Sequence, residues 1–273
     1  MAKQIAVIVA LILVIVVGIR LVTKVNYWRQ FLTSASPVAV ASPVPLPNQT
    51  QSAYTLSLEK LTKITFGQET FRFGFQKIDD PAELELFPNF EAKKAAKNLM
   101  TDNNCRFLIN SGFYSPENKP LGWFFSQGEL LNLPENNRLL NGFMSSNEAA
   151  GVVITDLPPQ GMVKWGFQSG PLLVVAGQKL PLAIRDDEYK RRAVAALTQT
   201  GELIFFVITT EESLNAGPPL ADLPSVIDII GQSLNEHLVS AINLDGGSAS
   251  AFLSQEIQID EVSLIGSYLC WQQ

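Results

Sequence analysis

The sequence predicts an α+β domain with a mixed twisted sheet, flanking helices and a C-terminal βαβ unit, preceded by one transmembrane helix. Three observations lead to this prediction. Residues 5–19 form an unbroken apolar run. Short β-type segments separated by turn signals recur between residues 70 and 175. An apolar segment, a helical pattern and a second apolar segment follow one another within residues 203–244.

The composition describes a chain that can bury a core but is a poor match to nucleic acid. Apolar residues make up 47% of the 273 residues and charged residues only 17%, which excludes a disordered chain. Four of the 20 basic residues lie in residues 1–30, and residues 31–50 carry no charge. Residues 51–273 therefore hold 16 basic and 26 acidic side chains, a net charge of −10. We expect no nucleic-acid partner, because phosphate binding needs an excess of Lys and Arg.

The N-terminal apolar segment is long enough to cross a membrane. Residues 5–22 would span about 27 Å as a helix, with Arg20 reaching toward the interface. A cleaved signal peptide is the alternative, but its best small-residue cleavage site, residues 39–41, lies about 20 residues beyond the apolar run. We therefore predict an uncleaved single-pass anchor over residues 1–31.

A proline-rich linker is predicted between the anchor and the domain. Residues 32–54 hold four prolines among Ser, Ala and Val, a composition typical of a semi-rigid spacer. The predicted domain then covers residues 55–273. Arg20, Lys24 and Arg29 follow the apolar run and by the positive-inside rule favour a cytoplasmic domain. The linker, together with the resemblance described below, leads us to predict the extracytoplasmic side instead.

The first part of the domain shows strand and hairpin patterns around one helix. Residues 70–76 alternate like a half-buried strand, and residues 91–100 consist of helix formers. The Ser126-Gln127-Gly128 turn signal predicts a hairpin between residues 121–125 and 129–133. The other predicted strands are residues 105–110, 151–155 and 171–175.

The last third of the chain has the clearest pattern. Residues 203–208 are apolar at every position, so both faces of this strand should be buried. Asp222 and Pro224 suit a helix start, and apolar residues follow at helical spacing from Leu223 to Leu238. Residues 240–244 are the next strand. The order strand, helix, strand predicts a βαβ unit with parallel strands, whose carboxyl-end loops favour ligands.

Those loops carry the best candidates for chemistry. Asp245 ends a buried strand and is followed by Gly246 and Gly247, which allow close approach of a ligand. Glu211 and Glu212 follow the other strand of the unit, which predicts carboxylates along one sheet edge. An ordinary Asp-Gly turn is the alternative reading of Asp245.

Three further segments have a similar character. Residues 110–114 (NSGFY) offer an amide, a glycine and two aromatic rings at a strand end, a set suited to sugar binding. Residues 168–171 (QSGP) open another strand, and Arg192 begins a short apolar strand where it could clamp a phosphate. Each of these also fits a plain turn or a solvated charge.

Other kinds of site are poorly supported. His237 is the single histidine, and we interpret it as a residue at the end of the predicted helix; no Gly-x-Ser-x-Gly elbow is present. Two cysteines and one histidine also argue against a His/Cys zinc site, and no cofactor-binding motif occurs. Cys105 and Cys270 would form one disulfide in an exported domain, or remain two free thiols.

Four segments in this order resemble the phosphodiester glycosidase family. They are residues 110–114 (NSGFY), 168–175 (QSGPLLVV), 191–208 (RRAVAALTQTGELIFFVI) and 242–253 (INLDGGSASAFL). With its flanks the resemblance covers residues 55–273. The family includes bacterial envelope proteins of the exopolysaccharide-biosynthesis type. The resemblance implies hydrolysis of a sugar-1-phosphodiester in an envelope glycan or glycoconjugate.

The resemblance also places site residues. Asp245 and Arg192 match family positions, and we predict them as the carboxylate at the anomeric carbon and the phosphate clamp. Glu211 or Glu212 would be a second carboxylate, although many members have an Asp-Gly pair there. The Gly246 and Gly247 amides would donate to an oxyanion. The predicted substrate-binding residues are Asn110, Gly112, Ser169, Gly170, Gly246, Gly247 and Ser250.

Two alternatives belong to other functional classes. One is a catalytically silent glycan-binding module in exopolysaccharide assembly, which the altered segment after Ile208 favours. The other is a purely structural envelope protein. The predicted partners are a carbohydrate phosphodiester and, through residues 5–22, a membrane, with no cofactor and no metal.

Overall fold

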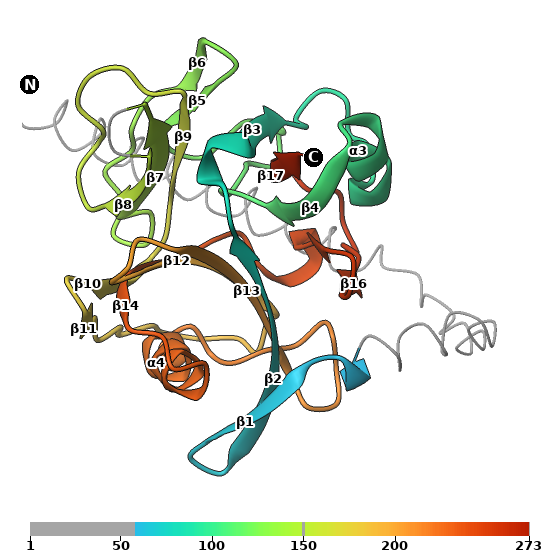
Figure 1. Cartoon of the computed structure of the whole chain (residues 1–273), viewed down its shortest axis with the longest axis vertical. Helices are drawn as coiled ribbons and strands as arrows, with labels where there is room; N and C mark the ends of the chain where they lie inside the picture. Colours follow the sequence, from blue (N-terminus) through green and yellow to red (C-terminus); the bar gives the residue numbers. More distant parts are fainter. Residues whose placement is uncertain (1–57, 149–150, 273) are drawn as a thin grey trace, which may run out of the picture. The chain divides into compact units, whose positions relative to one another are not determined.

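The computed structural model describes residues 58–148 and 151–272, which belong to one unit spanning Asn48–Gln273 (Figure 1). The predicted anchor (residues 1–31) and linker (residues 32–54) lie outside the described residues. Within the described part, no helix is both long and apolar enough to cross a membrane. The unit is dominated by β-sheet, with few helices.

One seven-stranded sheet forms the centre of the unit. Its strand order is β1-β2-β13-β12-β14-β10-β11. In that order the strands are β1 (Thr62–Phe66), β2 (Glu69–Ile78), β13 (Leu203–Thr210), β12 (Arg192–Thr198), β14 (Leu238–Asn243), β10 (Leu172–Val175) and β11 (Gln178–Lys179).

Two five-stranded sheets complete the β-structure. The first is β16 (Gln258–Ile259), β15 (Phe252–Leu253), β4 (Cys105–Asn110), β17 (Ser267–Gln272) and β3 (Leu84–Pro88), in that order. The second is β6 (Glu129–Asn132), β5 (Phe124–Ser126), β9 (Trp165–Ser169), β7 (Gly142–Asn147) and β8 (Gly151–Thr155). The helices whose full extent lies within the described residues are α3 (Ala96–Asp102), α4 (Leu223–Ser233) and the short 3₁₀ turns Pro81–Glu83 and Gly247–Ala249.

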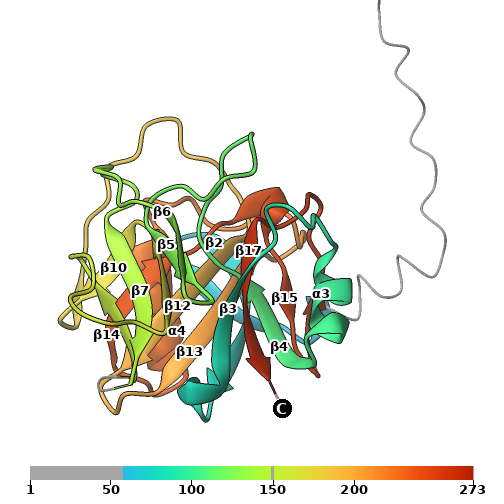
Figure 2. The ribbon, with the colours of Figure 1, turned by 90° about the horizontal axis from the view of Figure 1, so that it is seen from above.

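The central sheet buries both of its faces. On β13, Leu203, Phe205 and Val207 join a core shared with the two five-stranded sheets. The alternate residues of β13 pack instead in a core with the apolar face of α4. This confirms the prediction that residues 203–208 are buried on both faces. In Figure 1, α4 lies beside the central sheet, and in Figure 2, α3 lies beside β4.

The predicted mixed sheet is wrong, and the βαβ unit is only partly right. Every strand pairing in residues 58–148 and 151–272 is antiparallel. β13 and β14 are parallel to each other, because each pairs antiparallel with β12, which lies between them. The carboxyl ends of β13 and β14 therefore lie at the same edge of the sheet as the start of β12. Because β12 separates them, β13 and β14 are about 9.6 Å apart, whereas adjacent strands are about 4.8 Å apart.

The first helix is shorter than predicted. α3 begins at Ala96, and residues 91–95 are not helical. The Asn89 side chain donates to the Lys94 carbonyl and accepts from the Lys94 amide, both at 3.0 Å. These bonds replace a helical start, because an Asn side chain competes locally with backbone helix bonds. The Ala96 amide donates instead to Oε1 of Glu261 at 2.8 Å.

The second helix also ends early. α4 stops at Ser233, and Leu238 belongs to β14 rather than to the helix. Asn235 adopts a left-handed conformation with a φ of 56°, which ends the helix. His237 therefore lies in the connection to β14. Asp222 occupies the N-cap position, but its side chain makes no capping hydrogen bond.

The remaining local predictions are confirmed within one to three residues. β2, β4, β8 and β10 cover the predicted strands. β5 and β6 form the predicted hairpin around Gln127 and Gly128, whose φ angles are both positive, as in a tight two-residue turn. Cys105 and Cys270 form a disulfide between the neighbouring strands β4 and β17, with the Cα atoms 5.3 Å apart.

Candidate active site

Asp245 lies just beyond β14, at the sheet edge where β12 begins. The Leu244 amide donates to the Ala193 carbonyl at 2.8 Å, which continues the pairing with β12. The Asp245 amide donates to the Ser111 carbonyl at 3.0 Å. Asp245 is thus held between the central sheet and the segment that follows β4.

Asn110 fixes the loop that carries Asp245. Its side-chain amide donates to the Asp245 carbonyl at 2.6 Å, and its amide oxygen accepts from the Ala251 backbone at 3.0 Å. Asn110 is 1% exposed, so these two bonds satisfy it without a ligand. Asn110 is one of the predicted substrate-binding residues, and in the structure it positions the loop of Asp245.

The two glycines after Asp245 allow close backbone packing. A Cβ atom on Gly246 would lie 2.6 Å from the Arg191 carbonyl oxygen, and Gly247 has a φ of 63°. The Gly247 amide donates to that same carbonyl at 2.8 Å. The Gly246 backbone hydrogen-bonds the Asp245 carboxylate. Both amides thus have partners within the protein, and both glycines line a pocket beside Asp245, so their donation to an oxyanion stays a prediction.

The Asp245 carboxyl is half-buried and unusually basic. Burial raises its pKa from 3.8 to about 7, because desolvation disfavours the charged form. The Gly246 hydrogen bond and the positive charge of Lys190 act in the opposite direction but do not offset burial. A carboxyl with this pKa changes its protonation state near neutral pH, as catalytic acids and bases often do.

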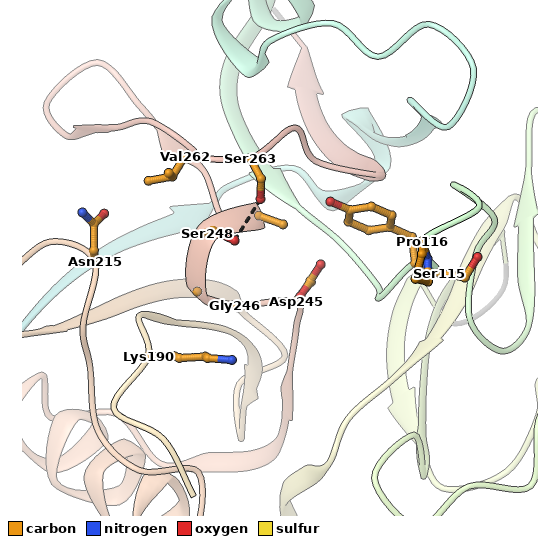
Figure 3. Close-up of a pocket in the computed structure, with 12 residues that line it drawn as sticks. Ser115, Pro116, Lys190, Asn215, Asp245, Gly246, Ser248, Val262 and Ser263 are labelled. Atoms are coloured by element: carbon orange, nitrogen blue, oxygen red, sulfur yellow. Dashed lines mark hydrogen bonds between the residues drawn. The ribbon is translucent and has the colours of Figure 1, made fainter. Parts of the chain in front are cut away.

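Two pockets adjoin Asp245. One has a volume of about 620 Å³, and we call it the hydroxyl pocket because Tyr114, Ser115, Ser248 and Ser263 line it (Figure 3). The other has a volume of about 520 Å³, and we call it the acidic pocket because residues 186–188 line it. Residues that line both pockets are Lys190, Asp245 and Gly246.

Lys190 is a site residue that the sequence reading missed. It ends the charged segment 185–190 (RDDEYK), a pattern typical of a solvated surface, yet it lines the hydroxyl pocket together with Gly246 (Figure 3). It forms an ion pair with Glu188. The sequence carried one usable signal, because Lys190 and Arg192 are two residues apart at a strand start and both line the acidic pocket.

Arg192 is at the predicted edge but is held by protein groups. Its Nε donates to the Pro218 carbonyl at 2.9 Å, and one Nη donates to the Glu188 carbonyl at 2.7 Å. The same Nη lies 3.4 Å from Asp187, and Arg192 is 8% exposed. Burial lowers the pKa of Arg192, and the charges of Asp187 and Glu188 oppose that shift.

Glu211 and Glu212 are not brought to Asp245. Glu211 is at the β2 side of the sheet, where its carboxylate pairs with Lys63 at 2.5 Å and its backbone carbonyl accepts from Arg72. The hydrogen bond and charge of Lys63 lower the pKa of Glu211. Neither glutamate is among the described residues that line the hydroxyl or acidic pocket.

Two other predicted binding residues support the framework beneath Asp245. The Ser169 hydroxyl donates to the Asn243 carbonyl at 2.8 Å, and the Gly170 amide donates to the same oxygen at 3.0 Å. The side-chain amide of Asn243 in turn donates a hydrogen bond to the Gly170 carbonyl at 2.9 Å. Gly170 also lines the acidic pocket, next to Pro171.

Gly112 and Ser250 are packed within the protein. A Cβ atom on Gly112 would lie 2.9 Å from the Gln168 carbonyl oxygen, so glycine allows close contact with β9. Ser250 is fully buried, and its carbonyl accepts from the Arg191 guanidinium. Asn110, Gly112, Ser169 and Ser250 therefore make contacts within the protein and are not among the described residues that line either pocket.

Tyr114 and two serines face Asp245 across the hydroxyl pocket. Burial raises the pKa of Tyr114 and the Asp245 charge adds to the effect, so the phenol stays protonated. Its hydroxyl donates to the Leu264 carbonyl at 2.6 Å. Ser263 donates to Ser248 at 2.9 Å (Figure 3). No group of three metal-binding side chains is gathered in the described part of the chain.

Comparison with known proteins identifies the family. The profile of the phosphodiester glycosidase family matches residues 103–265, more than half of the chain. The chain belongs to the phosphodiester glycosidase family. This confirms the resemblance read from the four sequence segments, and the matched range contains Asp245, Arg192 and Lys190.

Solved structures share the fold at low sequence identity. One is the zebrafish N-acetylglucosamine-1-phosphodiester alpha-N-acetylglucosaminidase catalytic domain auto-inhibited by pro-peptide, with a TM-score of 0.63 and 15% identity. That match covers 78% of this chain and 81% of the zebrafish one. A "hypothetical protein" from Synechocystis matches with a TM-score of 0.60 and 13% identity, over 77% of this chain and 61% of that chain. No curated protein sequence matches this chain at a significant level.

Proposed function

We propose that this protein hydrolyses a sugar-1-phosphodiester, with Asp245 as the carboxylate that acts at the anomeric carbon. The family supports the bond class, and the position of Asp245 between two pockets supports its role. A scissile bond that joins two different chemical groups needs a binding region on each side of the reacting carboxylate. Asp245 is the acid that both pockets share.

The reaction uses Asp245 in its ionised form. As a nucleophile, the carboxylate forms a bond to the anomeric carbon while the carbon–oxygen bond to phosphate breaks, and water then releases the sugar. As a base, it takes a proton from the water that attacks the same carbon. In both cases the electron pair of the broken bond leaves on the phosphate oxygen.

Lys190 is our choice for the cation that stabilises the departing phosphate. The leaving group changes from a diester with one negative charge to a monoester with more, so a nearby cation favours the products of bond breaking. Lys190 adjoins Asp245 from both pockets, whereas the described bonds of Arg192 are to protein groups. This replaces the initial assignment of Arg192 as the phosphate clamp.

Catalytically silent glycan binding is the second candidate function. The observation that favours it is the distance of Glu211 and Glu212 from the pockets, which leaves Asp245 without the second carboxylate that many glycosidases use. A phosphate leaving group offsets that lack, because it departs without strong general acid catalysis.

An extracytoplasmic, membrane-anchored location is part of the proposal. The Cys105–Cys270 disulfide supports export, because such bonds persist in oxidising compartments. The anchor over residues 5–22 and an envelope glycan as substrate rest on the sequence alone. Fractionation of cells into membrane and soluble parts tests the anchor, and protease treatment of intact spheroplasts tests the extracytoplasmic side. A soluble protein would contradict the anchor, and a protected domain would contradict the extracytoplasmic side.

The test of activity is release of free sugar from a panel of sugar-1-phosphodiesters, including UDP-N-acetylglucosamine and UDP-glucose. We expect the purified protein to release the reducing sugar and the phosphorylated aglycone, which is UDP for these two substrates, in equal amounts. Binding of the sugar without release, measured by calorimetry, would favour the silent module. Neither binding nor release from any member would favour the structural role.

A further inference from the structure

The two pockets beside Asp245 differ in charge. The acidic pocket includes three acids, Asp186, Asp187 and Glu188, in addition to Asp245. Its two cations are Lys190 and Arg192, so acids are in excess. Of the described residues that line the hydroxyl pocket, Asp245 is the one acid and Lys190 the one cation.

Local contacts deepen this difference. Burial raises the pKa of Asp187, but hydrogen bonds from the Ala221, Leu220 and Glu188 amides outweigh burial and hold the pKa below its usual range. Asp187 is therefore a permanent negative charge at neutral pH. The Arg192 guanidinium donates to Glu188 and Pro218 carbonyls, which limits its capacity to bind another anion.

From this asymmetry we infer that the acidic pocket takes the sugar and the hydroxyl pocket takes the phosphate with its aglycone, so that an anionic sugar is disfavoured. The inference rests on the proposed function. Asp245 and Lys190 lie at the boundary, where the anomeric carbon–oxygen bond must be. A phosphate placed in the acidic pocket would instead face an excess of carboxylates.

The hydroxyl pocket has donors to spare for a phosphate. Ser263 donates to Ser248, so the Ser248 hydroxyl keeps its own proton for another acceptor. Both Ser248 and Lys190 are exposed, and Lys190 has three protons, of which the pair with Glu188 needs one.

The acidic pocket has the groups that recognise sugar hydroxyls. Carboxylates accept hydrogen bonds from hydroxyl groups, and Phe113 provides an aromatic surface in the same lining. Asn243 also lines this pocket, and its buried amide oxygen has no hydrogen-bond partner among the described residues. The pocket thus has acceptors for a neutral or amino sugar, and its charge opposes a uronate.

A matched pair of substitutions tests the division. Ser248→Asp adds one negative charge to the hydroxyl pocket, and Asn137→Asp adds one to the acidic pocket at a similarly exposed position. We would measure the Kd of glucose-1-phosphate by calorimetry with the full chain. We expect Ser248→Asp to weaken binding at least tenfold, and Asn137→Asp to weaken it less than threefold. Equal losses, or a larger loss with Asn137→Asp, would overturn the division.

A second measurement addresses the sugar itself. Glucuronate-1-phosphate differs from glucose-1-phosphate by a carboxylate, and we expect it to bind the wild-type chain at least fivefold more weakly. Equal or tighter binding would overturn the charge argument. Turnover of UDP-glucose is measured in the same experiments. Absence of turnover together with the expected binding pattern would contradict the proposed glycosidase activity but support the division of the pockets. Turnover together with the reverse binding pattern would support the activity but overturn the division.

Discussion

The loops after β13 and β14 leave the same sheet edge, and each carries carboxylates, yet their chemistry differs. Glu211, after β13, is also partly buried, but it pairs with Lys63, and that pairing lowers its pKa. Asp245, after β14, is half-buried between two pockets and has a pKa of about 7. Position at a sheet edge therefore does not make a carboxylate reactive. The surroundings of the loop decide the pKa of its carboxylate, and here Asn110, the last residue of β4, and Ser111 bind the loop of Asp245.

The largest expected effect separates these two loops directly. Asp245→Asn should lower kcat for sugar release by about 10³-fold, because the amide can act neither as nucleophile nor as base. Glu211→Gln should change it less than twofold. Both rates are measured as free sugar released from the best substrate of the panel, with circular dichroism to compare the folds. Similar losses in the two variants would end the distinction between the loops.

The pH dependence should follow Asp245. If the ionised carboxylate acts, kcat/KM rises with pH through about 7 and levels off above it. At pH 5 roughly 1% of the carboxylate is ionised, so the rate should be about a hundredfold lower than the plateau. Activity that falls as pH rises through 7 would instead assign Asp245 as a proton donor.

The cations beside the two carboxylates provide the next test. Lys190→Met should lower kcat by about 30-fold, less than for a buried oxyanion donor, because Lys190 is exposed. Lys63→Met, which removes the partner of Glu211, should leave the rate within twofold. A loss with Lys63→Met comparable to that with Lys190→Met would show that the reacting site includes the β13 loop.

Stability should respond with the opposite sign to activity. Folding raises the pKa of Asp245, so the folded chain binds this proton more tightly than the unfolded chain does. The stability that the protonated carboxyl contributes is therefore lost as pH rises from about 4 to 7. At pH 8, Asp245→Asn should therefore raise the free energy of unfolding by about 1–4 kcal/mol. Denaturant titration at pH 8 checks this. A variant less stable than the wild type would mean that burial of the ionised carboxylate does not destabilise the folded state.

Local sequence patterns predicted about half of the strands, for physical reasons, and did not predict β1, β3, β7, β9 or β17. The continuous apolar run at residues 203–208 predicts a strand with both faces buried, because every side chain in it is apolar, and all six residues are buried in the structure. The position of β12 between β13 and β14 was not predictable, because strand order depends on contacts far apart in the sequence. Helix α3 was overpredicted because the Asn89 side chain bonds the Lys94 backbone, a local contact that helix propensity does not include.

Asp245 was predicted from the sequence as part of the candidate site, but several other residues that line its pockets, such as Lys190, Ser248 and Tyr114, were not assigned to it. The Asp-Gly-Gly segment singled out Asp245, since a carboxylate followed by two glycines has a recognisable pattern. Lys190 was not predicted, because the sequence around an exposed lysine in a charged segment does not distinguish a functional residue from a solvated one. Ser248 and Tyr114 meet only through folding, 134 residues apart in the sequence, so no local pattern pairs them.

The most direct test of the central claim is hydrolysis of UDP-glucose, or of the best substrate in the panel, in ¹⁸O-labelled water. Attack at the anomeric carbon places the label on the released sugar, and this is the result we predict; mass spectrometry within minutes limits exchange at the anomeric hydroxyl. Label on the phosphorylated product, UDP in the case of UDP-glucose, would mean that water attacked phosphorus. That result would contradict a glycosidase with Asp245 at the anomeric carbon.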